Sequence, residues 1–210
     1  MTPGQYDREA DVISKQLPVG PRVAVVGSTT FWGHDTEEIC VTVGTQLAGL
    51  EGMVLITGGM PGVAEAVGRS FLAERHNKTA HIYHILPRGS DAWDYGITLH
   101  GGDNMEDRRE ILGRLSSVYL SIEGGPGTAH EAQVARNYRA TIVPIGRTGG
   151  FSLEIYPEIS CPQPQVESEW QLLNDPTASL ERLSHAVKHI VDVLNRHSDK
   201  RTGVGAPKSQ

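Results

Sequence analysis

Five short runs of apolar residues are spaced along the chain, and each predicts a buried β-strand. The runs are rich in β-branched and aliphatic residues, a pattern typical of strands covered on both faces of a parallel sheet. Pro144 lies in the last run and has no amide hydrogen to donate, which places that strand at or near a sheet edge. The predicted strands cover residues 22–26, 54–57, 81–86, 118–122 and 141–145.

Longer segments with apolar residues at helical spacing separate these strands. Strands that alternate with helices predict a parallel, doubly wound sheet, so the fold class is α/β and Rossmann-like. In the strand order 3-2-1-4-5, strands one and four are neighbours where the winding reverses, and ligands bind beyond their carboxyl ends. The predicted helices cover residues 35–50, 63–75, 104–115, 131–139 and 177–197.

Four stretches fall outside this alternation. Residues 1–20 have weak apolar periodicity and are expected to form an arm, or a short helix outside the core. Residues 88–102 are expected to be irregular. Residues 147–176 contain several prolines, and we interpret them as a surface connection rather than a flap over a site. The polar tail 198–210 predicts disorder, which leaves residues 21–197 as one domain.

Composition excludes several classes of protein. The net charge of −6 argues against a general nucleic-acid binder, which usually shows a basic face. Cys40 and Cys161 are far apart and suggest neither a disulfide framework nor a thiolate metal site. No apolar run reaches the ~20 residues that span a membrane, and no secretory signal is visible. The expectation is a soluble protein of a reducing compartment, the cytoplasm.

Three loops of small residues follow strands one, two and four, and the predicted strand order brings them to one crevice. The third loop precedes a helix, whose free amide groups and dipole favour an anion such as phosphate. The alternative is that each glycine turn is only a tight connection. The loop residues are Gly27 and Ser28, then Gly58, Gly59 and Gly62, then Gly124, Gly125, Pro126, Gly127 and Thr128, which is also a candidate helix cap.

Chemistry is expected from a carboxylate and two arginines. Glu131 lies about one turn into the helix after the third loop, within reach of a sugar attached to a bound phosphate. Arg108 and Arg109 could bind a phosphate or a leaving base, because the planar guanidinium binds oxyanions at two points. The alternative is a solvated helix face whose acidic residues pair with these arginines. Trp93 and Tyr95 either stack on a base or anchor a loop.

Two motifs resemble a known family. Residues 124–131, Gly-Gly-Pro-Gly-Thr-Ala-His-Glu, resemble the GGxGTxxE signature of the LOG (lonely guy) family, and Met105-x-x-Arg108-Arg109 resembles its MxxRK motif. The first two glycine loops also resemble that family, in the same order along residues 22–145. The resemblance implies a phosphoribohydrolase that cleaves the N-glycosidic bond of nucleoside 5′-monophosphates. In that mechanism Arg108 and Glu131 are catalytic.

The same resemblance implies the other properties of the site. Residues 124–128, with Met105 and Arg109, would bind the nucleotide phosphate, and the protein would be a homodimer that needs neither a metal nor another cofactor. No nucleic-acid or membrane partner is implied. Some residues depart from the family pattern: Glu123 stands where proline is usual, and Arg109 replaces lysine. Since related branches include molybdenum-cofactor carriers and nucleotide sensors, the alternative is a non-catalytic nucleotide or cofactor binder.

Overall fold

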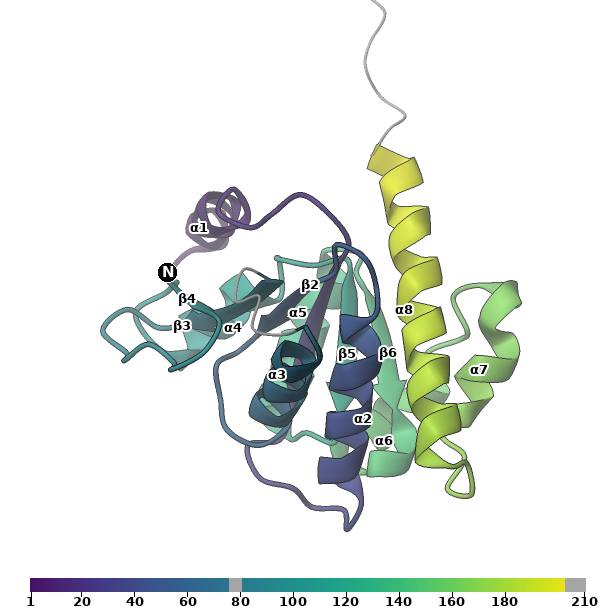
Figure 1. Cartoon of the computed structure of the whole chain (residues 1–210). Helices are drawn as coiled ribbons and strands as arrows, with labels where there is room; N and C mark the ends of the chain where they lie inside the picture. Colours follow the sequence, from purple (N-terminus) through teal and green to yellow (C-terminus); the bar gives the residue numbers. More distant parts are fainter. Residues whose placement is uncertain (76–80, 203–210) are drawn as a thin grey trace, which may run out of the picture.

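A parallel sheet forms the centre of the molecule. Within residues 1–75 and 81–202, which the computed structural model describes, six strands pair in the order β4-β3-β2-β1-β5-β6 (Figure 1). All neighbouring strands are parallel, and β1 and β5 meet where the winding reverses. The strands are β1 (Arg22–Gly27), β2 (Val54–Thr57), β3 (Ile82–Leu86), β4 (Ile97–His100), β5 (Val118–Ile122) and β6 (Thr141–Ile145).

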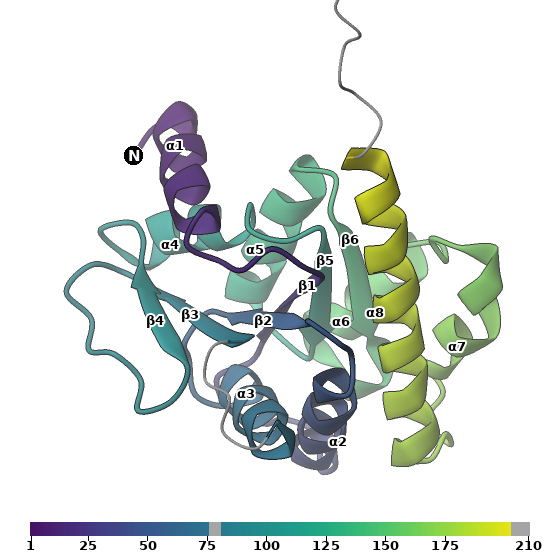
Figure 2. The ribbon, with the colours of Figure 1, turned by 45° about the horizontal axis from the view of Figure 1, so that its top comes forward.

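Helices cover both faces of the sheet (Figure 2). One face packs against α2 (Thr36–Ala48), α3 (Val63–Glu74) and α8 (Leu180–Thr202), and the other against α1 (Pro3–Ser14), α4 (Met105–Leu112) and α5 (Pro126–Asn137). Alternate residues of a strand point to opposite faces. Val23 and Val25 of β1 therefore join the first cluster, while Ala24 and Val26 join the second.

The expected doubly wound α/β fold and strand order are confirmed, with one strand added. The five predicted strands occur in the predicted order, and β6, which contains Pro144, lies at a sheet edge. Residues 88–102 were expected to be irregular, but Ile97–His100 pairs with β3 as the strand β4 at the other edge. None of the four residues of β4 is fully buried, so no apolar run marks this strand in the sequence.

The segment 147–176 is more ordered and more buried than a surface connection. It contains α6 (Gly150–Ile155) and α7 (Glu167–Leu172), with short 3-10 turns beside them. Val166, Trp170 and Leu173 enter the core on the α8 side of the sheet. The interpretation as a surface connection was therefore wrong. The sequence does not reveal α6 and α7, because helices of six residues are too short to show apolar residues repeating at helical spacing.

The two ends of the chain also differ from expectation. Residues 3–14 form α1, whose Ala10 and Ile13 are buried against the sheet, so this helix is not outside the core. At the other end α8 continues to Thr202, so residues 198–202 are helical rather than disordered. Residues 203–210 of the predicted disordered tail lie outside the described residues.

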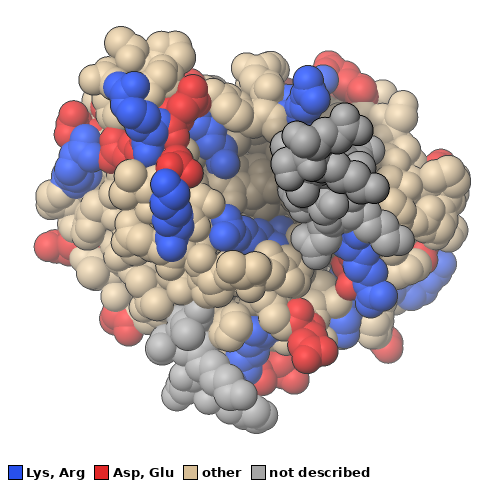
Figure 3. Space-filling view, turned by 90° about the horizontal axis from the view of Figure 1, so that it is seen from above, with Lys and Arg blue, Asp and Glu red and all other residues tan. Residues whose placement is uncertain are grey.

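Charges of both signs are mixed on the face that carries α1. The left-hand part of Figure 3 shows basic and acidic side chains side by side. Ion pairs account for this mixture: Lys15 with Asp11, Arg88 with Glu9, and Arg114 with Asp7. Among the described residues, no helix is long and apolar enough to cross a membrane.

Candidate functional site

A cleft of about 260 Å³ lies at the carboxyl edge of the sheet, where β1, β2 and β5 end. The strand register explains why, since Gly27 of β1 pairs with Ile122 of β5 and the loops that follow leave the sheet at the same level. The sequence-predicted residues that line the cleft are Gly27, Ser28, Gly58, Met105, Arg108, Arg109, Gly125, Pro126, Gly127, Thr128 and Glu131.

Arg108 and Glu131 form a buried ion pair in this cleft. They come from α4 and α5, and their side chains are only 2% and 9% exposed. The Arg108 Nη1 donates a hydrogen bond to the Glu131 Oε1, and the Nη2 donates to the Gly58 carbonyl. The Nε donates to the Ile85 carbonyl over 3.0 Å. Burial lowers the pKa of Arg108 while the Glu131 carboxylate opposes that shift, and an arginine keeps its charge in proteins.

Residue 58 must be a glycine, because the Arg108 guanidinium occupies the space that a side chain at residue 58 would need. A Cβ atom at residue 58 would lie 1.5 Å from the Arg108 Nη2. No heavier residue fits there while the guanidinium keeps its place. The second loop therefore carries a residue that the buried arginine requires.

The turn before α5 offers free amide groups. Gly125 is the N-cap residue of α5 and Pro126 its first helical residue, so Thr128 lies in the first turn and is not the cap. The first amide groups of a helix have no partner within it, and no described residue accepts a hydrogen bond from the amides of Gly127 or Thr128. The guanidinium of Arg109 lies over this turn, 3.0 Å from the Cβ position of Gly127. These groups form a positive corner of the cleft.

Three predicted glycines shape the loops without lining the cleft. Gly124 and Gly62 have positive φ angles of 99° and 76°, which favour glycine. A Cβ atom at Gly62 would lie 2.6–2.7 Å from the backbone of Ser28 and Thr29, so the first two loops touch there. Gly59, with φ of 57°, is held by its neighbours, because its amide donates to the Thr57 hydroxyl over 3.1 Å.

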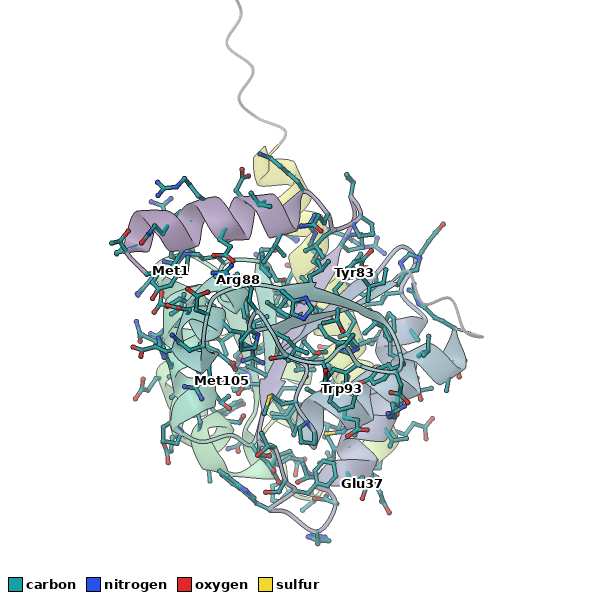
Figure 4. All side chains as sticks on the ribbon, turned by 90° about the vertical axis from the view of Figure 1, so that its left-hand side faces the viewer. Met1, Glu37, Tyr83, Arg88, Trp93 and Met105 are labelled. Atoms are coloured by element: carbon teal, nitrogen blue, oxygen red, sulfur yellow. The ribbon has the colours of Figure 1, made fainter. Side chains whose placement is uncertain are left out.

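Trp93 anchors this second loop, and Tyr95 packs against Gly68 of α3. The Trp93 Nε1 donates to the Gly59 carbonyl over 2.9 Å, and neither aromatic residue lines the cleft. Figure 4 looks onto the β4 edge of the sheet and shows Met105 on the α4 side and Trp93 on the α3 side. Beneath them, His84 contacts the Thr57 hydroxyl at 2.7 Å and the Tyr95 carbonyl at 3.1 Å. Burial lowers the pKa of His84 to about 4.

The other interpretation of the charged helix, a solvated face, is wrong for Arg108. The acidic neighbours on α4 have other partners: Asp107 accepts from the Tyr6 hydroxyl, and Glu110 pairs with Arg114 and His130. Arg109 is half-buried and forms no ion pair with any residue that the structure describes. Arg108 therefore lines the cleft as half of a buried ion pair, and Arg109 lines it without an acidic partner among the described residues. Among the described residues, no group of three or more metal-ligating side chains is placed to hold an ion.

Two cleft features were not predicted from the sequence. Trp32 lines the cleft from the loop after β1 and is 57% exposed. Glu123 lies beneath that loop, fully buried, and its carboxylate accepts hydrogen bonds from Ser28, Trp32, Gly33 and Thr36. The signal that could have found Glu123 is its departure from the family motif, where it replaces proline.

Known structures and a family model match this chain. A solved structure titled TM1055 is 26% identical, covers 66% of this chain and 81% of its own, and has a TM-score of 0.56. Two structures of the molybdenum cofactor carrier protein from Chlamydomonas reinhardtii are 20% and 21% identical, with TM-scores of 0.52 and 0.53. Each covers 82% of this chain and 98–99% of its own, a similarity that shows the fold. No curated protein matches. The model of the SLOG cluster4 family matches residues 21–174, and the chain belongs to that family.

Proposed function

We propose that this protein is a phosphoribohydrolase that cleaves the N-glycosidic bond of a nucleoside 5′-monophosphate, releasing the base and ribose 5-phosphate. The observation that carries the proposal is the buried Arg108–Glu131 pair beside the free amides of Gly127 and Thr128 in one cleft. A carboxylate and an oxyanion site then lie one helical turn apart on α5. The spacing suits a ribose held by its 5′-phosphate.

The phosphate contributes binding energy away from the reacting bond. The amides at the start of α5 and the Arg109 guanidinium would hold it, with the helix dipole adding to the attraction. Such remote contacts position the sugar so that C1′ faces Glu131. Affinity for ribose 5-phosphate should therefore be a large part of the affinity for the whole nucleotide.

Glu131 would act on the anomeric carbon. Bond cleavage builds positive charge on the ribose, and a nearby carboxylate stabilises it. The Oε1 atom is bound by Arg108, so the other oxygen is the one that can orient a water. That water attacks C1′ and gives a proton to Glu131, while the C1′–N bond breaks and its electron pair leaves with the base. The base then gains a proton from solvent, and Glu131 returns its proton to solvent, which balances the hydrolysis.

A carrier or sensor role would use the same cleft without turnover. One observation favours it: all three guanidinium nitrogens of Arg108 already donate to Glu131, Gly58 and Ile85. An arginine held in this way shapes the cleft and does not need to reach a leaving base. The ligand would then be a nucleotide or a related cofactor that is retained intact.

A panel of nucleoside 5′-monophosphates, with free base followed by chromatography, tests the proposal. We expect Glu131→Gln to lower base release at least ~100-fold, the usual contribution of a general base, with binding changed less than about threefold. Glu106→Gln, at an exposed position of α4, is the matched control and should behave as the wild type. Release unaffected by Glu131→Gln would remove that residue from the mechanism. Tight binding with no release of any base would establish the carrier or sensor role instead.

The resemblance to the LOG family also supports a cytoplasmic homodimer. A cleft of about 260 Å³ lies below the ~300–1,000 Å³ of most small-molecule sites. A partner subunit placed at the mouth would enclose more of the ligand. Sedimentation equilibrium tests this, since a monomer at micromolar concentration would exclude the shared site.

A further inference from the structure

Trp32 is the most exposed tryptophan that the structure describes. It is 57% exposed, whereas Trp170 in the core is 4% exposed. A large aromatic ring in water loses the stabilisation that burial provides, so its exposure on the rim of a cleft suggests a ligand. Trp32 lines the same cleft as Arg108 and Glu131, from the loop between β1 and α2.

The loop that carries Trp32 is held in one place by the buried carboxylate of Glu123. The amides of Trp32 and Gly33 both donate to the Oε1, over 2.9 Å and 2.8 Å, and the Thr36 hydroxyl donates to it over 2.6 Å. The Ser28 hydroxyl donates to the Oε2. Hydrogen bonds to a charged acceptor are stronger than neutral ones. The loop is therefore a preorganised wall.

Glu123 is itself fixed from the other side. Its amide donates to the Thr148 hydroxyl over 2.8 Å, and its carbonyl accepts from the Ser152 amide over 3.1 Å. These two partners belong to the segment 146–155, so that segment supports the cleft from behind. Hydrogen bonds therefore connect this segment to Glu123, and Glu123 to the backbone of Trp32.

The indole of Trp32 rests on glycines. A Cβ atom at Gly150 would lie 2.6 Å from the Cζ3, and one at Gly125 would lie 3.6 Å from the Cη2. Because side chains are absent at both positions, the ring lies over the start of α5 and keeps the rest of its surface open. A ligand held by its phosphate at that helix start passes this open surface as it leaves the cleft.

We propose that Trp32 is the stacking surface for a planar ring of the ligand, and that Glu123 is the residue that positions it. The inference rests on the proposed function, because it takes the ligand to be a nucleotide held by its phosphate. It adds the residue that would recognise the base, which the proposed function leaves unassigned. Stacking on a tryptophan tolerates different bases, since every base has a π face. The stacking would therefore hold the base without discriminating strongly between bases.

Intrinsic fluorescence tests the stacking directly. Adenosine 5′-monophosphate should quench Trp32, and ribose 5-phosphate, which binds the phosphate corner without a base, should not. Trp32→Ala should abolish the quenching and weaken binding of the nucleotide about tenfold or more, with the affinity for ribose 5-phosphate unchanged. Trp32→Phe should keep affinity within about threefold. Tyr138→Ala, which removes an exposed aromatic ring at the far end of α5, is the matched control.

The role of Glu123 is tested by a double-mutant cycle. Glu123→Gln should weaken nucleotide binding about as much as Trp32→Ala, and the double variant should be no weaker than either, because both remove one contact. Additive losses would assign Glu123 a separate role. If Glu123→Gln does not fold, Thr148→Val, which removes the support of the Glu123 amide, replaces it in the cycle.

Several outcomes would overturn the stacking surface. An unchanged nucleotide affinity in Trp32→Ala, or an equal loss for nucleotide and ribose 5-phosphate, would exclude it. A change in the sedimentation of Trp32→Ala without ligand would place the indole in a subunit interface instead. The two proposals can fail separately. If nucleotide binding depends on Trp32 but no base is released, hydrolysis is refuted and stacking is not. If Trp32→Ala releases base and binds nucleotide as the wild type does, stacking is refuted and hydrolysis is not.

Discussion

Replacing Gly58 with alanine should displace Arg108 with little other change. The backbone of Gly58 has no positive φ angle, so alanine meets no conformational strain there. The new Cβ atom would lie 1.5 Å from the Arg108 Nη2 and 2.5 Å from the Cζ, whereas ordinary contact begins near 3.4 Å. The guanidinium must therefore retreat by about 2 Å, which breaks its contacts to the Gly58 carbonyl and to Glu131.

The size of the effect follows from the burial of the pair. Breaking a buried ion pair costs about 3–5 kcal/mol, because one charge is left without a partner. Partial relaxation of Arg108 toward the open cleft places the loss near the lower value, about 3 kcal/mol. For a chain of this size that loss lowers the melting temperature by about 6–12 °C. Base release should fall as well, since Glu131 loses the group that orients it.

Urea unfolding and calorimetry measure the first effect, and the nucleotide panel measures the second. Gly125→Ala is the matched control for stability, because its Cβ atom would meet only the Trp32 ring at 3.6 Å and its φ is an ordinary −118°. We expect that variant to unfold within about 0.5 kcal/mol of the wild type. If Gly58→Ala unfolds at the same urea concentration as the wild type, Arg108 is not packed against residue 58. The buried pair would then not hold the cleft together.

Two further predictions concern His84 and Arg109. Burial lowers the pKa of His84 to about 4 from about 6.5, so the unfolded chain binds the extra proton first. Stability should therefore fall by up to about 3 kcal/mol as the pH drops from 6.5 to 4, and His84→Gln should remove most of this slope in urea unfolding. If the pH dependence of stability is unchanged in His84→Gln, the loss of stability comes from other groups. Arg109→Ala should weaken ribose 5-phosphate binding about tenfold with an unchanged melting temperature, measured by titration calorimetry; equal affinity would move the phosphate away from the start of α5.

Continuous apolar runs and apolar residues at helical spacing predicted most of the fold. The buried strands β1, β2, β3, β5 and β6 were visible because residues covered on both faces must be apolar. The strand β4 was missed because it lies half-covered at an edge, where polar residues are allowed. The short helices α6 and α7 were missed because six residues do not complete two helical turns.

The position of the cleft could be predicted from the sequence, but the contacts between its side chains could not. Glycine loops after neighbouring strands predicted that Ser28, Gly58 and the 124–128 turn would meet, since parallel strands end at one edge. Neither the burial of Arg108 against Gly58 nor the wall formed by Trp32 could be predicted in this way. Both depend on side chains from elements more than 40 residues apart along the chain.

The order of apolar runs and glycine turns was enough by itself to determine the class of fold and the edge of the sheet where the cleft lies. That information is local, because burial and turn geometry each constrain a residue through its nearest neighbours. Only the tertiary structure decided which charges lie together: Glu123 beneath the first loop, and Arg108 between Gly58 and Glu131. A charge removed from water must find partners, and those partners can come from any part of the chain that the fold brings near.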